Sequence, residues 1–261
     1  MTSSTFNCSR FLPGWGLGCA PLARAFRQQD AATPWQIQAL PGSPPDVRVP
    51  ENFRDAVEAL LARLPEKCHL GGWSLGATLA LALAARAPER VISLTLIAAT
   101  PCFVARPDWR NACPSAEFRA FARKVERDGA DALPAFIAGF CRGDQDAKNC
   151  CHFLEKHAEP LPRAALVAGL RWLAEADLRA DIPRIACPVF LLHGENDPLI
   201  PLEAARWLAQ TLPRARLTRL PGKAHAPFLN TPAATCFLRE CAHHEFQPQS
   251  PPPQEADTPL V

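Results

Sequence analysis

The sequence predicts an α/β fold with a mainly parallel sheet flanked by helices, and three observations favour it. Short apolar or β-branched runs alternate with segments whose apolar residues recur at helical spacing, which is the pattern of βαβ units. The chain has 261 residues, enough for one large domain or one domain with an insertion. Apolar residues make up 48% and charged residues 21%, which is typical of a globular protein.

The elements expected in the first part of the chain are a short strand ending at 11–12, a strand at 35–40, a helix at 53–64, a strand at 68–73, a helix at 77–87 and a strand at 91–98. The strand at 35–40 alternates and then meets Pro41-Gly42, a turn signal. Helical spacing of apolar residues defines 53–64, and Pro88 closes the Ala- and Leu-rich helix. The run 91–98 (VISLTLIA) is nearly uncharged, as in a buried parallel strand.

Residues 107–180 interrupt this alternation, because their apolar residues keep helical spacing and no β-rich run appears. Two further strands are expected at 189–192 and 216–220. The sequence therefore predicts a core in two parts, 1–106 and 181–245, with a helical cap inserted at 107–180 over the strand ends. The Pro- and Gln-rich tail, 246–261, is expected to be disordered.

Charge and cysteine content indicate which partners and which cellular compartment to expect. The formal net charge is +2, which gives no argument for nucleic acid or an acidic membrane surface as a partner. No apolar run reaches the roughly 18 residues of a membrane-spanning helix. Residues 1–10 lack an apolar segment of secretory length, and the eleven cysteines are an odd number. We expect a cytoplasmic, reduced and monomeric chain.

The adjacent residues Cys150-Cys151-His152 are of the types that bind metal ions. These residues lack the paired C-x-x-C spacing of structural zinc sites. Most of the thiols are better explained as small buried apolar side chains. No metal and no organic cofactor is expected.

Gly72-Trp73-Ser74-Leu75-Gly76 matches the pattern G-x-S-x-G. The pattern alone occurs by chance in roughly one chain of this length in ten. Its context is more specific, because an expected strand precedes it and a strong helix follows it, as in the nucleophile elbow of serine hydrolases. Small residues on both sides of the serine allow the sharp turn. Ser74 is the candidate nucleophile, and the alternative is a glycine-rich turn with an uninvolved serine.

A serine hydroxyl needs a base, and the base needs an orienting carboxylate. In α/β-hydrolases these follow the serine in the order acid, then histidine. Asp197 lies in the turn after the strand at 189–192 and is the preferred acid, with Glu195 as its rival. His225 is the preferred base because it lies in a loop of small residues after the last expected strand. A surface-loop histidine is the alternative.

Two backbone amides are expected to stabilise the negative charge on the substrate oxygen. One belongs to Leu75, directly after the nucleophile. The other is assigned to Trp15, in the Pro13-Gly14-Trp15-Gly16 turn after the first strand. Simple packing of the Trp15 side chain is the alternative, and the two roles are compatible.

These motifs and their surroundings resemble those of the pimeloyl-[acyl-carrier protein] methyl ester esterases, the carboxylesterases of biotin synthesis. The shared pieces, spread over residues 13–228, are P-G-W-G-L, L-P-G, G-W-S-L-G, P-E-R-V, P-C-F-x-A-R-x-x-W, D-x-x-[IV]-P and A-H-A-P-F. The resemblance implies an α/β-hydrolase fold with a helical cap, and hydrolysis of the methyl ester of pimeloyl-acyl-carrier protein with release of methanol.

The resemblance also implies roles for individual residues. Ser74, Asp197 and His225 fall on the family's triad, and Trp15 and Leu75 fall on its oxyanion donors. The residues implied for the acyl pocket are Trp73, Phe103 and Phe136.

The sequence departs from the family at three places. One is its start, which lies almost at the first expected parallel strand, so that the family's antiparallel leading strands are expected to be missing. Pro13 stands where the family has a histidine. The family holds the acidic carrier protein through basic residues on its cap, and the corresponding stretch here includes Asp131 and Ala135. Other basic residues of the cap supply a basic face or are solvated surface charges: Arg123, Lys124, Arg127, Arg142 and Lys148.

Two other functions remain open on the sequence alone. The same triad would serve a hydrolase of another small ester, thioester or carbon–carbon substrate. A non-enzymatic binding protein on the same fold is the third reading, and the loss of a triad residue would favour it.

Overall fold

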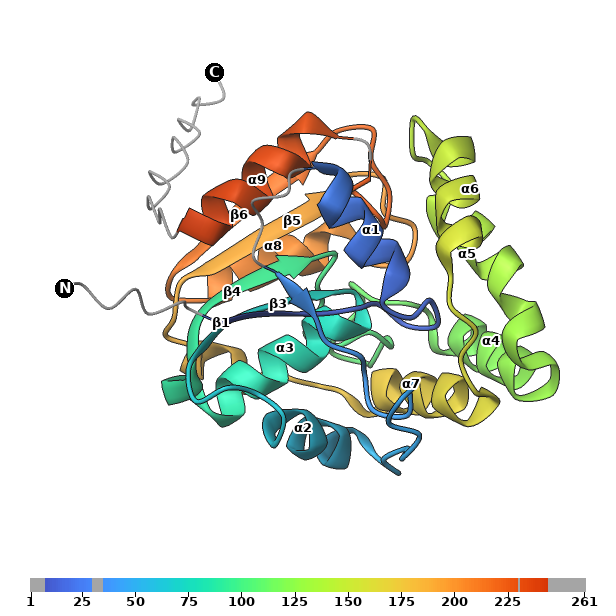
Figure 1. Cartoon of the computed structure of the whole chain (residues 1–261), viewed down its shortest axis with the longest axis horizontal. Coiled ribbons are helices and arrows are strands. Elements are labelled where there is room, and N and C mark those ends of the chain that lie inside the picture. Colours follow the sequence, from blue (N-terminus) through green and yellow to red (C-terminus); the bar gives the residue numbers. More distant parts are fainter. Residues whose placement is uncertain (1–7, 30–34, 230, 244–261) are drawn as a thin grey trace, which may run out of the picture.

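The computed structural model describes residues 8–29, 35–229 and 231–243, which form a parallel sheet with helices on both faces (Figure 1). Its strands are β1 (Cys8–Leu12), β2 (Gln36–Ile37), β3 (Cys68–Trp73), β4 (Val91–Ile97), β5 (Val189–Gly194) and β6 (Ala215–Leu220). Their order in the sheet is β2-β1-β3-β4-β5-β6. All five neighbouring pairs are parallel, which confirms the predicted fold class.

The strand order reverses beside β1, because the chain places β2 on one side of β1 and β3 on the other. Loops that leave β1 and β3 at their carboxyl ends therefore diverge. In open α/β sheets, ligands bind in the crevice outside the carboxyl ends at such a reversal. The topology alone points to the ends of β1 and β3 as the place for a site.

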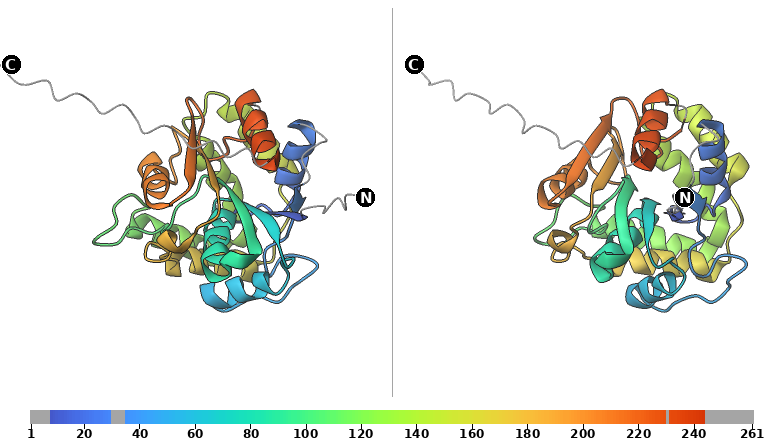
Figure 2. Two further views of the ribbon diagram at one scale, coloured as in Figure 1. Left: turned by 90° about the vertical axis from the view of Figure 1, so that its left-hand side faces the viewer. Right: turned by 60° about the vertical axis from the view of Figure 1, so that its left-hand side comes forward.

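Helices cover the two faces of the sheet and enclose two apolar cores. One core includes residues of α2 (Phe53–Leu61), α3 (Leu75–Arg86) and α8 (Leu202–Thr211). The other includes residues of α1 (Ala20–Gln29) and α9 (Pro232–His243). Figure 2 shows α1 and α9 on the opposite side of the sheet from α2. Every residue of β3 and β5 is buried, which explains their continuous apolar runs.

Four helices lie between β4 and β5: α4 (Ser115–Asp128), α5 (Leu133–Cys141), α6 (Ala147–His157) and α7 (Arg163–Glu175). Short 3₁₀ segments occur at Pro88–Arg90, Gly129–Ala132 and Ile182–Arg184. The helical character predicted for 107–180 is therefore observed, apart from isolated bridges such as Arg106 to Trp109. We call α4–α7 and their connections the inserted helices. The exact division of the chain into core and cap remains a prediction, and the predicted disordered tail lies outside the described residues.

Element bounds differ from the sequence prediction at several places. The strand expected at 35–40 is paired as a strand only over Gln36–Ile37, although the Gln38 amide still donates to the Phe11 carbonyl oxygen at 2.9 Å. The helix expected at 53–64 ends at Leu61 and continues in tighter turns. The helix expected at 77–87 begins earlier, at Leu75. Among the described residues, no helix combines the length and apolar character that a membrane span requires.

Candidate active site

A sharp turn between β3 and α3 carries Ser74. Its φ of 56° and ψ of −120° lie in a left-handed region that residues other than glycine rarely adopt. A Cβ on Gly72 would lie 2.2 Å from the carbonyl oxygen of Gly76, and a Cβ on Gly76 would lie 2.3 Å from that of Leu12. The close approach of the backbone therefore requires both glycines of the motif. The turn leaves Ser74 at the carboxyl edge of the sheet, directly before α3.

His225 lies between Ser74 and Asp197. Its Nε2 is 2.9 Å from Oγ of Ser74, and its Nδ1 is 2.8 Å from Oδ2 of Asp197. The side chains of His225 and Asp197 are 2% and 0% exposed. Because the carboxylate of Asp197 accepts a hydrogen bond from Nδ1–H, the ring proton stays on Nδ1. The lone pair of Nε2 then faces the serine hydroxyl. The structure thus brings the three predicted triad residues into one hydrogen-bonded chain.

Asp197 lies among hydrogen-bond donors. Its Oδ1 accepts the backbone amides of Leu199 and Ile200 at 2.9 and 3.0 Å. Burial by itself would raise the pKa of Asp197, but the charge and hydrogen bond of His225, with smaller effects of His193 and the Ile200 amide, lower the pKa below its ordinary value. Asp197 is therefore a carboxylate at neutral pH.

Glu195, the rival acid, points elsewhere. Its carboxylate lies 3.4 Å from the guanidinium group of Arg219, and its side chain is 31% exposed. Asp197 instead is buried against His225. The surroundings of the two carboxylates therefore distinguish them, whereas their order in the sequence does not.

Trp15 and Leu75 lie on the two loops that the topology brings together. Trp15 is in the turn after β1, and Leu75 is the first residue of α3. The Trp15 indole Nε1 donates to the Leu166 carbonyl oxygen at 2.8 Å, and its ring packs edge-on against Phe136 at 5.0 Å. The packing role considered for Trp15 is therefore present. The role of the two amides as oxyanion donors stays a prediction.

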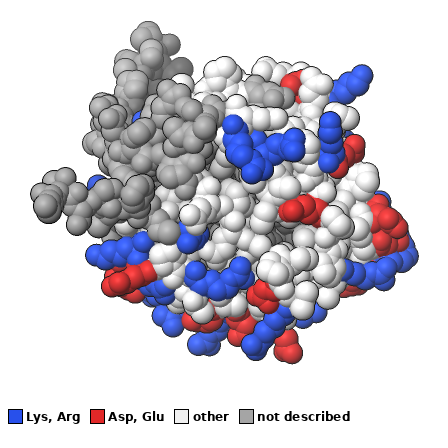
Figure 3. Space-filling model, in the orientation of Figure 1, with Lys and Arg blue, Asp and Glu red and all other residues white. Residues whose placement is uncertain are grey.

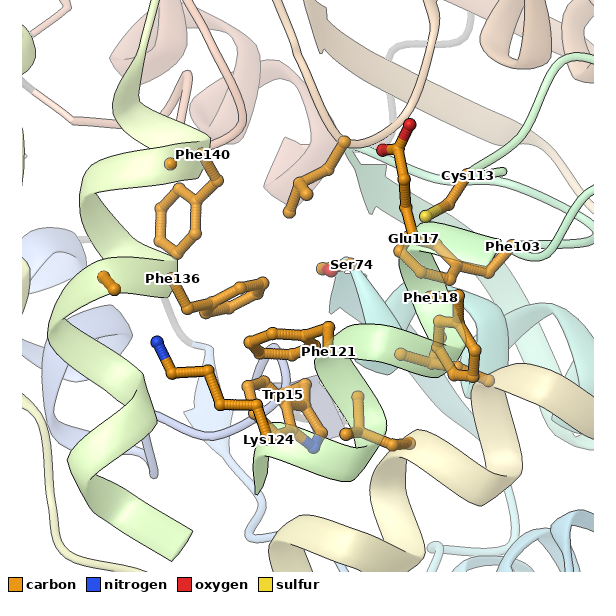
Figure 4. Close-up of a pocket in the computed structure, with 15 residues that line it drawn as sticks. Trp15, Ser74, Phe103, Cys113, Glu117, Phe118, Phe121, Lys124, Phe136 and Phe140 are labelled. Atoms are coloured by element: carbon orange, nitrogen blue, oxygen red, sulfur yellow. The ribbon is translucent and has the colours of Figure 1, made fainter. Parts of the chain in front are cut away.

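A cavity of about 270 Å³ opens at Ser74, between the sheet and the inserted helices (Figure 4). Two of its lining residues carry charges, Glu117 and Lys124, both on α4. The other lining residues are mainly apolar: Trp15, Phe103, Cys113, Phe118, Phe121, Ala135, Phe136, Gly139, Phe140, Leu170, Leu173 and Leu199. Such a surface suits an apolar chain whose reactive end reaches Ser74.

The predicted pocket residues divide into two groups. Phe103 and Phe136 line the cavity. Trp73 is not among the lining residues, because its side chain packs against Phe228 with ring centroids 5.0 Å apart. Its indole Nε1 donates to the His225 carbonyl oxygen at 2.9 Å. The structure shows a contact of Trp73 with the loop that carries His225, and the pocket role expected for Trp73 stays a prediction.

Sequence reasoning did not assign several lining residues, including Phe118 and Phe121 of α4 and Phe140 of α5. Their helical spacing was a usable signal, since Phe118 and Phe121 share one face of α4. The rings of Phe121 and Phe136 stack at 5.1 Å and join the two helices above the cavity. Periodicity shows that such a face is buried, but not that it lines a cavity.

The basic residues proposed for the cap are spread over the inserted helices. Arg123, Arg127, Arg142 and Lys148 are exposed. Arg127 lies 2.7 Å from Asp128, so this charge is partly balanced. On the face in Figure 3, side chains of both signs lie around a broad uncharged area. Over the inserted helices on that face, charges of both signs alternate and do not form a continuous basic patch.

Cys102, Cys141 and Cys150 are buried cysteines that form no disulfide. Burial raises the pKa of Cys150 to about 12. Within the described ranges, no group of three or more His, Cys, Asp or Glu side chains is placed to hold a metal ion. Cys150 therefore packs as a neutral thiol.

Comparisons with known proteins show the family of this chain. Residues 11–236 match the family model described as the Alpha/beta hydrolase family. A pimeloyl-[acyl-carrier protein] methyl ester esterase of Nitrosomonas europaea is 40% identical over 192 residues, which cover 72% of this chain and 76% of that protein. The protein of the same name from Aromatoleum aromaticum is 37% identical over 237 residues, covering 88% of this chain and 95% of that protein.

Solved structures support the fold at lower sequence identity. An esterase from Exiguobacterium antarcticum superposes with a TM-score of 0.74 and 17% identity, covering 91% of this chain and 92% of that one. An esterase from Thermogutta terrifontis gives a TM-score of 0.72 and 21% identity, covering 92% and 90%. The family match and the two relatives at 40% and 37% identity place the chain in the alpha/beta hydrolase family and, within it, in the family of the pimeloyl-[acyl-carrier protein] methyl ester esterases.

Proposed function

We propose that this chain is a serine carboxylesterase that hydrolyses the methyl ester of pimeloyl-acyl-carrier protein and releases methanol, in biotin synthesis. The observation that carries the proposal is the hydrogen-bonded chain Ser74–His225–Asp197 at the base of an apolar cavity. The names of the relatives, at 40% and 37% identity, supply the substrate.

The proposed reaction begins when Nε2 of His225 takes the hydroxyl proton of Ser74. Oγ then bonds to the ester carbonyl carbon, and the charge that develops on the carbonyl oxygen is stabilised by the amides of Trp15 and Leu75. The bond to the methoxy group breaks, and His225 gives its proton to the leaving oxygen, so methanol departs. Water repeats the sequence on the acyl-enzyme and frees the carboxylic acid. Asp197 holds the required tautomer of His225 and stabilises its charged form.

The size of the cavity fits a substrate that is carried by a larger partner. Its volume of about 270 Å³ lies just below the range of about 300–1,000 Å³ that is usual for small-molecule sites. An acyl chain fills such a space while the carrier protein stays outside. Lys124 lines the cavity, and Arg123 of the same helix is exposed, so this part of α4 offers positive charge to an acidic carrier.

We further propose that the chain works as a cytoplasmic monomer, with no nucleic-acid or membrane partner. Release of a free carboxylate from a carrier-bound ester needs no second subunit, since Ser74, His225 and Asp197 come from one chain. Size-exclusion chromatography with light scattering tests the monomer, and a dimer mass would contradict it.

The decisive experiment is hydrolysis of methyl pimeloyl-acyl-carrier protein by the full chain, beside a short p-nitrophenyl ester and the Ser74→Ala variant. We expect methanol release from the carrier substrate and none from the variant. Cleavage of the small ester alone would refute the substrate. If the intact chain cleaves neither ester, the catalytic assignment itself is wrong.

A further inference from the structure

A buried ion pair lies outside the triad and links the inserted helices to the loop of the base. Nζ of Lys223 is 3.3 Å from Oδ1 of Asp144, and the two side chains are only 3% and 2% exposed. Asp144 lies between α5 and α6, and Lys223 lies two residues before His225. Because two buried charges are costly unless they are well paired, each residue depends on the other.

Asp144 also contacts the backbone of the same loop. Its Oδ2 accepts the amide of Ala224 at 3.1 Å, and its Oδ1 accepts the amide of Asp146 at 2.8 Å. Ala224 is the residue between Lys223 and His225. One carboxylate therefore holds both the side chain and the backbone of the segment directly before the base.

Backbone bonds extend this attachment over the whole loop. The Gln145 amide donates to the Gly222 carbonyl oxygen at 2.8 Å, and the His225 amide donates weakly to the Phe140 carbonyl oxygen at 3.5 Å. The Phe140 ring lies edge-on to the imidazole of His225, 5.3 Å away. Each residue from 222 to 225 thus forms a hydrogen bond or an ion pair with the segment 140–145. We call the segment 140–145 the base clamp.

The turn that carries the acid is attached to the same two segments. The amide of Asn196 donates to the Lys223 carbonyl oxygen at 2.9 Å, and its side-chain Nδ2 donates to the Gly143 carbonyl oxygen at 2.8 Å. A Cβ on Gly194 would lie 2.1 Å from the Ala224 carbonyl oxygen, so the base loop packs directly on the end of β5. The base clamp, the base loop and the acid turn form one bonded unit.

We propose that Asp144 and Lys223 are positioning residues of the active site, and that the base clamp sets the place of the His225 imidazole relative to Ser74. This inference rests on the proposed role of His225 as base. Displacement of a reacting group by about 1 Å costs on the order of 10²-fold in rate. A pair that fixes the loop on two sides therefore acts on turnover rather than on substrate binding. It also ties this end of the inserted helices to the sheet.

The test compares Asp144→Ala and the double variant Asp144→Ala/Lys223→Met with the intact chain on a short p-nitrophenyl ester. This ester avoids any effect on carrier docking. Titration of Ser74 with a fluorophosphonate counts the competent sites, so that kcat is given per folded molecule. We expect kcat of Asp144→Ala to fall on the order of 10²-fold, with KM changed less than about threefold. The kcat of the double variant should fall no further than that of Asp144→Ala, because the two substitutions remove the same ion pair.

The matched control is Asp177→Asn, which weakens a partly buried ion pair of Asp177 with Arg179 after α7, away from the base loop. It should lower the melting temperature and leave kcat within twofold. If Asp144→Ala does not fold, the double variant decides, because it leaves no unpaired buried charge. A kcat within twofold of the intact chain in the folded variant would overturn the inference. An intact chain that cleaves no ester would instead refute the proposed function, and the inference with it.

Discussion

Trp73 donates a hydrogen bond from its indole Nε1 to the backbone carbonyl oxygen of His225 over 2.9 Å. The residue before Ser74 therefore fixes the backbone of the residue whose imidazole faces Ser74. The two rings lie 5.7 Å apart and are tilted by 43°, so the contact includes packing as well as the hydrogen bond. Trp73, whose expected pocket role stays a prediction, thus also holds the loop that carries His225.

Trp73→Phe tests this support. The change keeps an aromatic ring but leaves the His225 carbonyl oxygen without its donor, which costs about 1–3 kcal/mol of unfolding free energy. If about 1.4 kcal/mol of this is lost in the transition state, kcat falls about tenfold. Urea unfolding and steady-state kinetics on a p-nitrophenyl ester measure the two effects.

Trp35→Phe is the matched control for this change. Trp35 is also buried, but its Nε1 has no hydrogen-bond partner among the described residues. We expect the control to keep its kcat and to lose less stability. Equal losses in the two variants would show that the Trp73 hydrogen bond has no particular role.

Asp197→Asn and Glu195→Gln separate the two carboxylates of the acid turn. Because Asp197 fixes the tautomer of His225, its amide is expected to lower kcat about 10⁴-fold. Glu195 lies beside Arg219 at the surface, where one ion pair contributes little. Its variant should therefore stay within twofold of the intact chain. The same kinetic assay serves both, and the reverse ranking would assign the acid to Glu195.

The strained backbone at Ser74 predicts that two equally inactive variants, Ser74→Gly and Ser74→Ala, differ in stability. Ser74→Gly and Ser74→Ala both remove the nucleophile, which costs on the order of 10⁶-fold in kcat. Glycine adopts φ 56° and ψ −120° without the strain that alanine keeps. After its greater loss of chain entropy, the glycine variant should still be more stable than the alanine variant by about 1 kcal/mol. Parallel urea titrations measure this difference, and an alanine variant of equal or higher stability would contradict it.

The hydrogen-bonded arrangement of Ser74, His225 and Asp197 could be predicted from sequence because each residue follows a recognisable strand. Ser74, Asp197 and His225 come after runs that end β3, β5 and β6, and parallel strands place their carboxyl ends at one edge. The close backbone approach at Ser74 requires glycine at positions 72 and 76, and a short sequence motif is sufficient to show this requirement. Chain order and turn chemistry were sufficient for this part of the site.

The contacts that hold the triad could not be predicted in the same way. The bond from Trp73 to His225 and the ion pair of Asp144 with Lys223 join residues 152 and 79 positions apart. No period or motif marks such partners, because they depend on how the inserted helices pack on the sheet. The extent of β2 was also overestimated, since an alternating run does not reveal how many of its residues find a partner strand.

His193 gives the protein a defined sensitivity to acid. Burial lowers the pKa of His193 below its ordinary value, although Asp197 and the Ile200 carbonyl oxygen oppose this effect. Its Nε2 donates to the Ile200 carbonyl oxygen at 2.9 Å, next to the amide that binds Asp197. The unfolded chain therefore takes up a proton at this position at a higher pH than the folded chain does. Stability is lost as the pH falls below about 6.5, by at most about 1.4 kcal/mol per pH unit.

His193→Gln isolates this contribution, because its side-chain amide can donate to the same carbonyl oxygen but does not titrate. We expect the intact chain to lose more unfolding free energy than the variant between pH 7.5 and pH 5. The difference between the two pH profiles cancels the other histidines, which both proteins share. Urea unfolding at several pH values provides the measurement. Parallel profiles would mean that the folded state accommodates a charged His193, and that burial beside Asp197 does not keep it neutral.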